Sequence, residues 1–469
     1  MKTSLGLFAW CAGALSVSAQ PALTIYNQNF AVVREHVPLD LKSGVNAVTY
    51  PGATLKLEAD SVVLRDPTNK VPLRILEQSY RADALTASYL LSLYEGKPLD
   101  FIVRNQNGVE STIRGKVVRS GYLPGAATEG TPIIEVDGKL RFSMPGEPVF
   151  PALSDDAILK PTLTWQLASD QTTKVDAELA YITGGLSWLA SYNLVAPEKG
   201  GTLDVLGWIT ITNQTGKIFD NANVKLMAGD VNKIQPQFIA DRAFKGAVQP
   251  EAFSVASVTE KAFDEFHLYS LPRPITLHDE ETKQVEFLRV TGVKAQTIYE
   301  VDSSGFLTRV GPHATNKVAI VREFKNSQEN GLGIPLPKGR TRFYRRDDTD
   351  GQLQFTGENN IDHTARNEIV RLYTGDAFDL VAERQVSNQS ASARREQWED
   401  TIDLKLRNRK ADPVEIRVVE HLYRGPNWEI VEKSDDFTKV DARTIEFHIP
   451  VKPNEEKVLH YRVRYAKEP

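Results

Sequence analysis

The sequence predicts a mainly β protein with several domains, built as antiparallel β-sandwiches and ending in an immunoglobulin-like module. Three observations predict this fold class. Apolar residues recur at every second position through most of the chain. Polar turn sequences separate these short apolar runs. Hydrophobic residues make up 41% of the 469 residues, which is enough to fill ordinary cores.

Residues 1–19 have the layout of a secretory signal peptide. Lys2 precedes a short apolar run, and Val17-Ser18-Ala19 supplies the small residues of a cleavage site. We therefore expect export to the periplasm or the extracellular space of a bacterium. The single cysteine, Cys11, lies in this segment, so cleavage after Ala19 would leave a cysteine-free mature chain.

Charge and hydropathy limit the partners that we expect. The net charge of -5 provides no strong field for nucleic acid. The apolar run at the N-terminus is too short to span a bilayer, and no second run reaches that length. The mature chain is therefore expected to have no transmembrane segment and no nucleic-acid partner.

The N-terminal β domain is expected over residues 20–155. Within it, residues 83–95 contain helix-forming residues, begin with a capping aspartate and are followed by Gly96, so they predict a short helix. Apolar residues that follow between Leu99 and Val118 predict a small β-barrel-like unit.

A central β domain is expected over residues 160–325. Residues 202–213 alternate strictly, with Leu203 and Ile211 among the apolar positions of one face. Turn chemistry follows at residues 213–216, and then a second alternating run that includes Val224. These two strands are expected to form an antiparallel pair.

The C-terminal half repeats this pattern. A hairpin around Asp348-Thr349-Asp350-Gly351 is expected within residues 326–385, as a continuation of the central domain. Residues 386–469 are expected to form the immunoglobulin-like sandwich. Its alternating sets are Ile402, Leu404 and Leu406; Val414, Ile416 and Val418; Ile445, Phe447 and Ile449; and Leu459, Tyr461, Val463 and Tyr465.

Five residues are candidates for ligand binding. Trp188 and Tyr192 lie on one face of a presumed strand, as the aromatic platforms that stack on sugars do, although core packing is the commoner role of such a stripe. Asp362 and His363 are adjacent and can form an acid–base pair, or a turn in which the aspartate bonds its own backbone. Asp230 lies in a Gly-Asp-Val-Asn motif that turns and close backbone contacts also explain.

The familiar catalytic motifs are missing from the sequence, and no catalytic residue, metal or cofactor is expected. One alternative is a zinc site on neighbouring strands formed by His421, His448 and His460, against scattered surface histidines. Glu420 shares the phase of the apolar positions in its strand. Either a bulge shifts that strand, or a carboxylate points into the core and requires a partner.

Several motifs together resemble one bacterial exported family of unknown function, the family related to mucoidy inhibitor A type proteins. The motifs are Tyr-Ile-Thr-Gly-Gly-Leu-Ser-Trp at 181–188, Leu-Met-Ala-Gly-Asp-Val-Asn at 226–232, Phe-Lys-Asn-Ser at 324–327 with Gly-Leu-Gly-Ile-Pro-Leu-Pro at 331–337, and Glu-His-Leu-Tyr-Arg at 420–424 with Asn-Trp-Glu-Ile at 427–430. The resemblance implies an envelope setting and a β architecture. It transfers no catalytic residue, and this sequence lacks the long coiled coil common in that family.

The sequence therefore favours an exported, non-enzymatic binding or scaffold module of the cell envelope, whose partner is an envelope protein or a cell-surface glycan. A carbohydrate-binding or carbohydrate-active protein is the first alternative, and a metal-dependent hydrolase is the second. A sheet edge left open between modules would accept a strand from a partner.

Overall fold

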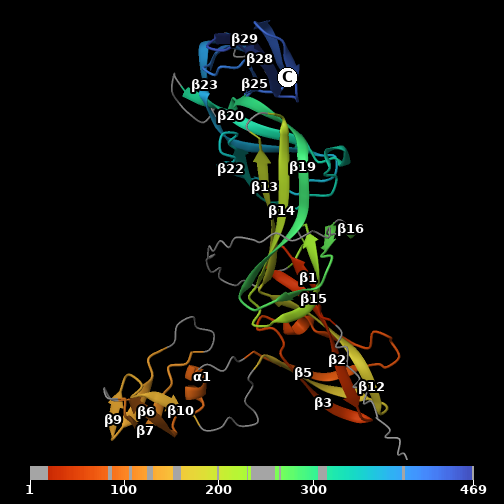
Figure 1. Cartoon of the computed structure of the whole chain (residues 1–469), viewed down its shortest axis with the longest axis vertical. Coiled ribbons are helices and arrows are strands. Elements are labelled where there is room, and N and C mark those ends of the chain that lie inside the picture. Colours follow the sequence, from red (N-terminus) through yellow and green to blue (C-terminus); the bar gives the residue numbers. More distant parts are fainter. Residues whose placement is uncertain are drawn as a thin grey trace, which may run out of the picture. The chain divides into compact units, whose positions relative to one another are not determined.

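A computed structural model of the chain describes residues 20–82, 87–104, 108–123, 130–150, 160–197, 200–229, 231–233, 259–263, 266–304, 314–392 and 397–466. The described chain is mainly β with several sheets, which confirms the predicted fold class (Figure 1). The expected signal peptide lies outside these residues and stays a prediction, as do the expected domain boundaries. No described helix is long and apolar enough to cross a membrane.

Contacts divide the chain into two compact units. The first comprises Met1–Ser187, Thr212–Lys225 and Arg273–Glu281, and the second comprises Trp188–Ile211, Leu226–Pro272 and Thr282–Pro469.

Most strands of the first unit belong to two sheets. One sheet contains β1 (Ala22–Tyr26), β2 (Phe30–Leu41), β4 (Val63–Arg65), β12 (Thr173–Gly184), β15 (Phe219–Ala228) and β18 (Ile275–Leu277). The second sheet has the order β3 (Gly44–Pro51), β11 (Thr162–Ser169) and β5 (Arg74–Arg81), and a 3-10 helix, η1 (Ala59–Ser61), precedes β4. Period-two alternation places Val33 and Leu39 in the core of the first sheet.

A third sheet of this unit contains β10 (Glu147–Val149), β6 (Pro98–Arg104), β7 (Glu110–Arg119), β8 (Ile133–Val136) and β9 (Lys139–Arg141), in that order. It is an open sheet within the described residues, with β10 and β9 at its edges, rather than a barrel. Within the predicted helix, Ala87–Ser92 form α1 and residues 93–95 form a turn, whereas residues 83–86 lie outside the described residues. Leu91 of α1 packs against Phe101 and Val117 of the sheet. Figure 1 shows α1 beside β6 and β10.

The second unit holds most of β13 and β14 and all strands from β19 onward. Its strands are β13 (Leu186–Ala196), β14 (Thr202–Asn213), β16 (Thr259–Phe263), β17 (Phe266–Ser270), β19 (Glu281–Asp302), β20 (Ala314–Lys325), β21 (Gly339–Arg346), β22 (Leu353–Ile361), β23 (Ile369–Ala391), β24 (Gln397–Asn408), β25 (Val414–His421), β26 (Trp428–Lys433), β27 (Phe437–Lys439), β28 (Thr444–Val451) and β29 (Glu456–Ala466). A 3-10 helix, η2 (Gln328–Asn330), follows β20.

Pairing in this unit departs from a purely antiparallel arrangement. Strand β21 pairs with β13, and β25 pairs with β19, both in parallel. The predicted hairpin is confirmed, because β21 and β22 pair antiparallel on either side of Asp348–Gly351. The pairing of β25 with β19 is confined to residues 299–302 at the end of β19, and this limit is important for the candidate site.

The expected pairing of residues 202–213 with the next strand was wrong. Strand β14 lies between β13 and β19, whereas β15 pairs with β1 and β18. The side chain of Asn213 donates to the carbonyls of Leu277 and His278 at 3.3 and 3.0 Å, and the N–H of Gly216 donates to Asp279 at 2.8 Å. These bonds hold the connecting segment against residues 277–279, so it does not close a hairpin.

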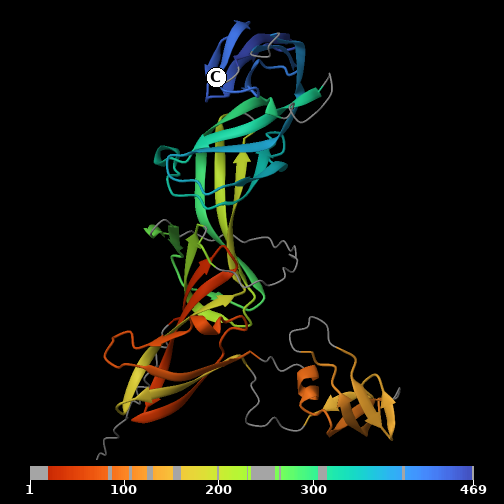
Figure 2. The ribbon, with the colours of Figure 1, turned by 180° about the vertical axis from the view of Figure 1, so that it is seen from behind.

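The C-terminal strands, drawn in blue in Figure 2, contribute to one apolar core. The four alternating sets predicted there coincide with β24, β25, β28 and β29, and Leu404, Ile416, Phe447 and Tyr461 are fully buried members of these sets. Strands β24 and β29 pair with each other, as do β25 and β28, and the two pairs contribute to the same core.

Candidate functional site

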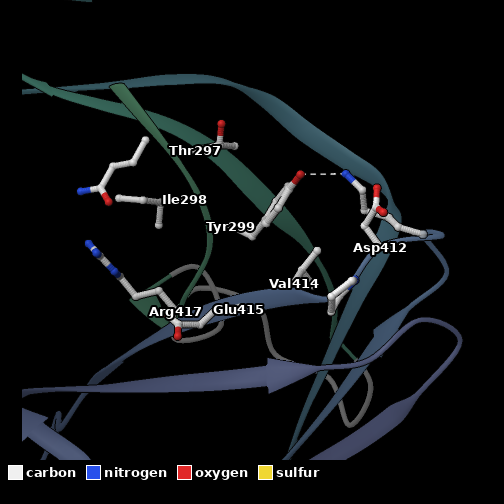
Figure 3. A pocket seen from close by; sticks show the side chains of 10 residues that line it. Thr297, Ile298, Tyr299, Asp412, Val414, Glu415 and Arg417 are labelled. Atoms are coloured by element: carbon white, nitrogen blue, oxygen red, sulfur yellow. Dashed lines mark hydrogen bonds between the residues drawn. The ribbon is translucent and has the colours of Figure 1, made fainter. Parts of the chain in front are cut away.

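A cavity of about 360 Å³ lies beside β19 in the second unit, and its size falls within the range of ligand sites. Its lining comes from two distant segments of the chain, Gln296, Thr297, Ile298 and Tyr299 on β19, and Lys410, Asp412, Pro413, Val414, Glu415 and Arg417 in β25 and the turn before it. Figure 3 shows the two groups of side chains facing one another. We call this the β19 cavity.

The β19 cavity lies at a break in the pairing along one edge of β19. The N–H of Ala295 donates to the carbonyl of Gly201 at 2.8 Å, and pairing with β25 begins at Tyr299. Between these points the described residues provide no partner strand on this edge, although β20 pairs along the opposite edge. We call the part of this edge at residues 296–298 the edge break. The backbone N–H and C=O groups of a strand point to its two edges alternately, so those of Thr297 point to the same edge as those of Ala295 and lie at the edge break.

A turn before β25 fixes Lys410 at this cavity. The side chain of buried Asn408 accepts a hydrogen bond from the Lys410 N–H at 2.9 Å and donates to the carbonyls of Asp412 and Val451. The Lys410 ammonium donates to the Tyr299 hydroxyl at 2.7 Å (Figure 3) and lies 4.8 Å from the ring centroid. Lys410 has no carboxylate partner among the described residues, so its remaining N–H groups are available to a ligand.

Arg417 borders the β19 cavity from β25. Its Nε lies 3.3 Å from a carboxylate oxygen of Glu446, and a terminal nitrogen lies 3.9 Å from Glu323. The Nε is nevertheless buried without a hydrogen bond to any described group. A buried donor of this kind is costly, so an acceptor supplied by a ligand would stabilise it.

Two acidic residues near Arg417 are in contact with a histidine. His448 lies 2.8 Å from Glu415 through Nδ1 and 2.7 Å from Glu446 through Nε2. The hydrogen bond to Glu415, followed by that to Glu446, raises the pKa of His448 above its usual 6.5. Lys410 and the Nε of Arg417 can donate to an acceptor, and a strand edge with such donors suits an extended peptide or a carboxylate.

Trp188 and Tyr192 are core residues, with 3% and 2% of their surfaces exposed. The indole N–H of Trp188 donates to the carbonyl of Met227, and the hydroxyl of Tyr192 donates to the carbonyl of Pro337 at 2.6 Å. Sugar stacking requires an accessible ring face, which these side chains lack. Their burial removes the reason to expect a carbohydrate platform here.

The other sequence candidates do not meet at one place in the described structure. Asp230 lies outside the described residues. Asp362 and His363 are exposed and lie just after β22. The hydroxyl of Thr364 donates to the carbonyl of Asp362 two residues earlier, as in a turn. The backbone N–H of Lys338 donates to His363 Nδ1 at 3.2 Å and joins this turn to the segment before β21.

The three C-terminal histidines have separate acidic partners. His421 lies 3.2 Å from Asp302, and His460 lies 2.6 Å from Asp403, whereas His448 lies between Glu415 and Glu446. Within the described ranges, no three His, Cys, Asp or Glu side chains come together as a metal site. These positions therefore give no support to the zinc alternative.

The phase of Glu420 is explained by a buried carboxylate, since β25 and β28 pair without a shift. Glu420 is fully buried, and Arg384 donates to its two oxygens at 3.1 and 3.0 Å. The hydroxyl of Tyr461 donates to Glu420 at 2.7 Å. Burial and this carboxylate raise the pKa of Tyr461 well above 10. Both oxygens of Glu420 therefore have donors, and the cluster links β23, β25 and β29.

Sequence reasoning missed the lining of the β19 cavity. Lys410 and Tyr299 are 111 residues apart, and no short motif connects them. The one local signal was the polar turn at residues 408–413, which marks the start of β25. Neither the parallel pairing of β25 with β19 nor the edge break follows from a turn sequence.

The fold and the β19 cavity define a multi-sheet β protein with a polar cavity beside the edge of one strand. A family model for a domain of unknown function, DUF4139, matches residues 177–467. The chain belongs to this family. A search of curated proteins found no significant match.

Proposed function

We propose that this chain is an exported, non-enzymatic binding module of the bacterial cell envelope, which takes up a short extended segment of a partner protein at the edge break of β19. The signal-peptide pattern at residues 1–19 and the resemblance to mucoidy inhibitor A type proteins support the envelope setting. We infer a peptide ligand from the unpaired part of the β19 edge.

The edge break at Thr297 is the observation that carries this proposal. From Ala295 to Tyr299 this edge spans four residue steps, about 13 Å at the usual rise of a strand, and no described strand pairs with it there. A partner backbone laid there would pair with Thr297, as added strands do at open sheet edges. Lys410 and Arg417 would favour an acidic residue or a terminal carboxylate in that segment.

Site-specific crosslinking in cells tests the proposal. A photo-crosslinking amino acid replaces Thr297 in one variant and Lys405, an exposed residue of β24 outside the cavity, in a control. We expect position 297 alone to give a discrete protein adduct in envelope fractions. The Lys410→Ala substitution should weaken this adduct, because a charge-assisted hydrogen bond is lost.

Two outcomes would count against the proposal. Equal adducts from positions 297 and 405 would indicate nonspecific contact. An adduct that persists unchanged in Lys410→Ala, with the variant folded by circular dichroism, would place the partner elsewhere on the surface.

A further inference from the structure

We infer that a second cavity of this unit, on the β16–β17 hairpin, is a binding site for a phosphomonoester group. The cavity has a volume of about 340 Å³ and is lined by Glu260, Lys261, His267, Pro335, Ala365 and Arg366. This cavity and the β19 cavity share no lining residue. The inference therefore does not depend on the proposed peptide ligand.

Glu260 organises the polar side of this cavity. Only 7% of its side chain is exposed. In the hairpin, His267 of β17 pairs with Ala262 of β16. Glu260 is two residues before Ala262 on β16, so Glu260 and His267 lie on the same face of the hairpin. The carboxylate lies 2.9 Å from His267 Nδ1 and accepts a hydrogen bond of 2.6 Å from Arg366. Its charge is therefore already matched by the guanidinium.

Arg366 keeps unused donors, because only one of its terminal nitrogens has a partner among the described residues. His267 contacts Glu260 through Nδ1 and leaves Nε2 without a described partner, and Nε2 is a donor to a ligand in the protonated ring. Lys261 is exposed on the same hairpin and forms no ion pair within the described chain. With a single carboxylate opposing Lys261 and Arg366, the cavity has an excess of positive charge, and this excess increases when His267 is protonated.

The remaining titratable neighbour adds no negative charge. The hydroxyl of Tyr269 donates to the carbonyl of Pro335 at 2.9 Å, and burial raises the pKa of Tyr269 well above 10. Tyr269 is thus neutral at physiological pH and holds Pro335 as one wall.

The donor set fits a phosphate better than a planar carboxylate. A phosphomonoester carries nearly two negative charges at neutral pH and offers oxygens in three directions. The guanidinium, the imidazole and the ammonium approach from different residues, and an arginine fork suits phosphate oxygens. Pro335 and Ala365 leave an apolar wall for the organic group that bears the phosphate.

Calorimetric titration of the full chain with inorganic phosphate tests this site. We expect saturable binding to the wild type that weakens about tenfold or more in Arg366→Ala, because a charge-assisted hydrogen bond is removed. Arg443→Ala is the matched control, since Arg443 is exposed and lies outside the cavity. NMR signals of the His267 imidazole should shift with the same saturation curve, which needs no variant.

Co-sedimentation with phosphatidylcholine vesicles, with and without phosphatidic acid, separates the two sources of the phosphate. Sedimentation that depends on phosphatidic acid and on Arg366 would assign the group to a lipid headgroup. Phosphate binding without sedimentation would assign it to a soluble ester, and both results support the site. Absence of binding in both assays, or equal losses in Arg366→Ala and Arg443→Ala, would overturn the inference.

Discussion

Glu35 in the first unit and Glu420 in the second both lie on strands and accept hydrogen bonds from tyrosines, but their positively charged partners differ. In the first unit, Glu35 of β2 binds the Lys217 ammonium at 2.7 Å and accepts hydrogen bonds from Tyr50 and Tyr181 at 2.7 and 3.3 Å. The side chains of Glu35 and Lys217 remain 13% and 15% exposed. Solvent therefore still reaches this pair.

In the second unit, Glu420 of β25 is bound by Arg384 and Tyr461, and its side chain has no exposed surface. Arg384 is 8% exposed and donates to both carboxylate oxygens. A planar guanidinium can satisfy two oxygens at once, whereas an ammonium acts as a point charge. Of these two carboxylates, the one that is shielded from water is bound by an arginine, and the one that water still reaches is bound by a lysine.

The largest effect should follow from Arg384→Ala. The substitution leaves the Glu420 carboxylate buried with the Tyr461 hydroxyl as its donor, and breaking a buried pair in this way costs about 3–5 kcal/mol. We expect the free energy of unfolding of the second unit to fall by this amount, measured by hydrogen exchange at the amides of β25 and β29. Arg384→Lys should recover part of the loss, because a lysine cannot bind both oxygens.

The control for this prediction is the exposed Arg443, whose replacement by alanine should change stability by about 0.5 kcal/mol or less. If Arg384→Ala lowers the free energy of unfolding by less than about 1 kcal/mol, the view that the Arg384–Glu420 pair is shielded from water is wrong.

A smaller effect should follow from Lys217→Met in the first unit. Glu35 keeps its two tyrosine donors and some solvent, so we expect a loss of about 1.5–3 kcal/mol, the range for a hydrogen bond to a charged group. Hydrogen exchange at the amides of β2 and β12 measures it. If Lys217→Met costs as much as Arg384→Ala, the proposed difference between the two pairs is wrong.

These clusters also show how far the sequence could predict the structure. The phase of Glu420 within the apolar positions of β25 was a local signal and correctly raised the possibility of a core-facing carboxylate. Its partner was not predictable, because Arg384 lies 36 residues away on β23. The pairing of β23 with its neighbours is shifted by irregularities at both edges, which no alternation pattern reveals.

The same limit applies to the sheets and the candidate site. Alternation predicted the bounds and buried face of β14, because side-chain direction is a local property of a strand. The neighbours of β14 depend on distant hydrogen bonds, such as those of Asn213, and the expected hairpin was wrong for that reason. The β19 cavity was not visible in the sequence, since it exists where pairing with one strand stops before pairing with another begins.

A third carboxylate extends the comparison, because Asp66 is held by N–H and O–H donors rather than by a cation. It accepts hydrogen bonds of 2.9 Å from the backbone N–H groups of Thr68, Lys70 and Val71, and one of 2.8 Å from the Thr68 hydroxyl. The backbone hydrogen bond from Thr68, with these others, lowers the pKa of Asp66 from 3.8 to about 2.

The smallest effect is expected from acid titration of this turn. Because the pKa of Asp66 is lower in the folded chain, its contribution to stability is present above about pH 4 and is lost as the pH falls towards about 2. The amide NMR shifts of Thr68 and Val71 should change with a midpoint near pH 2, and Asp66→Asn should abolish this change. A midpoint near 3.8 would mean that these N–H and O–H donors do not favour the ionised form of Asp66, unlike the cations that bind Glu35 and Glu420.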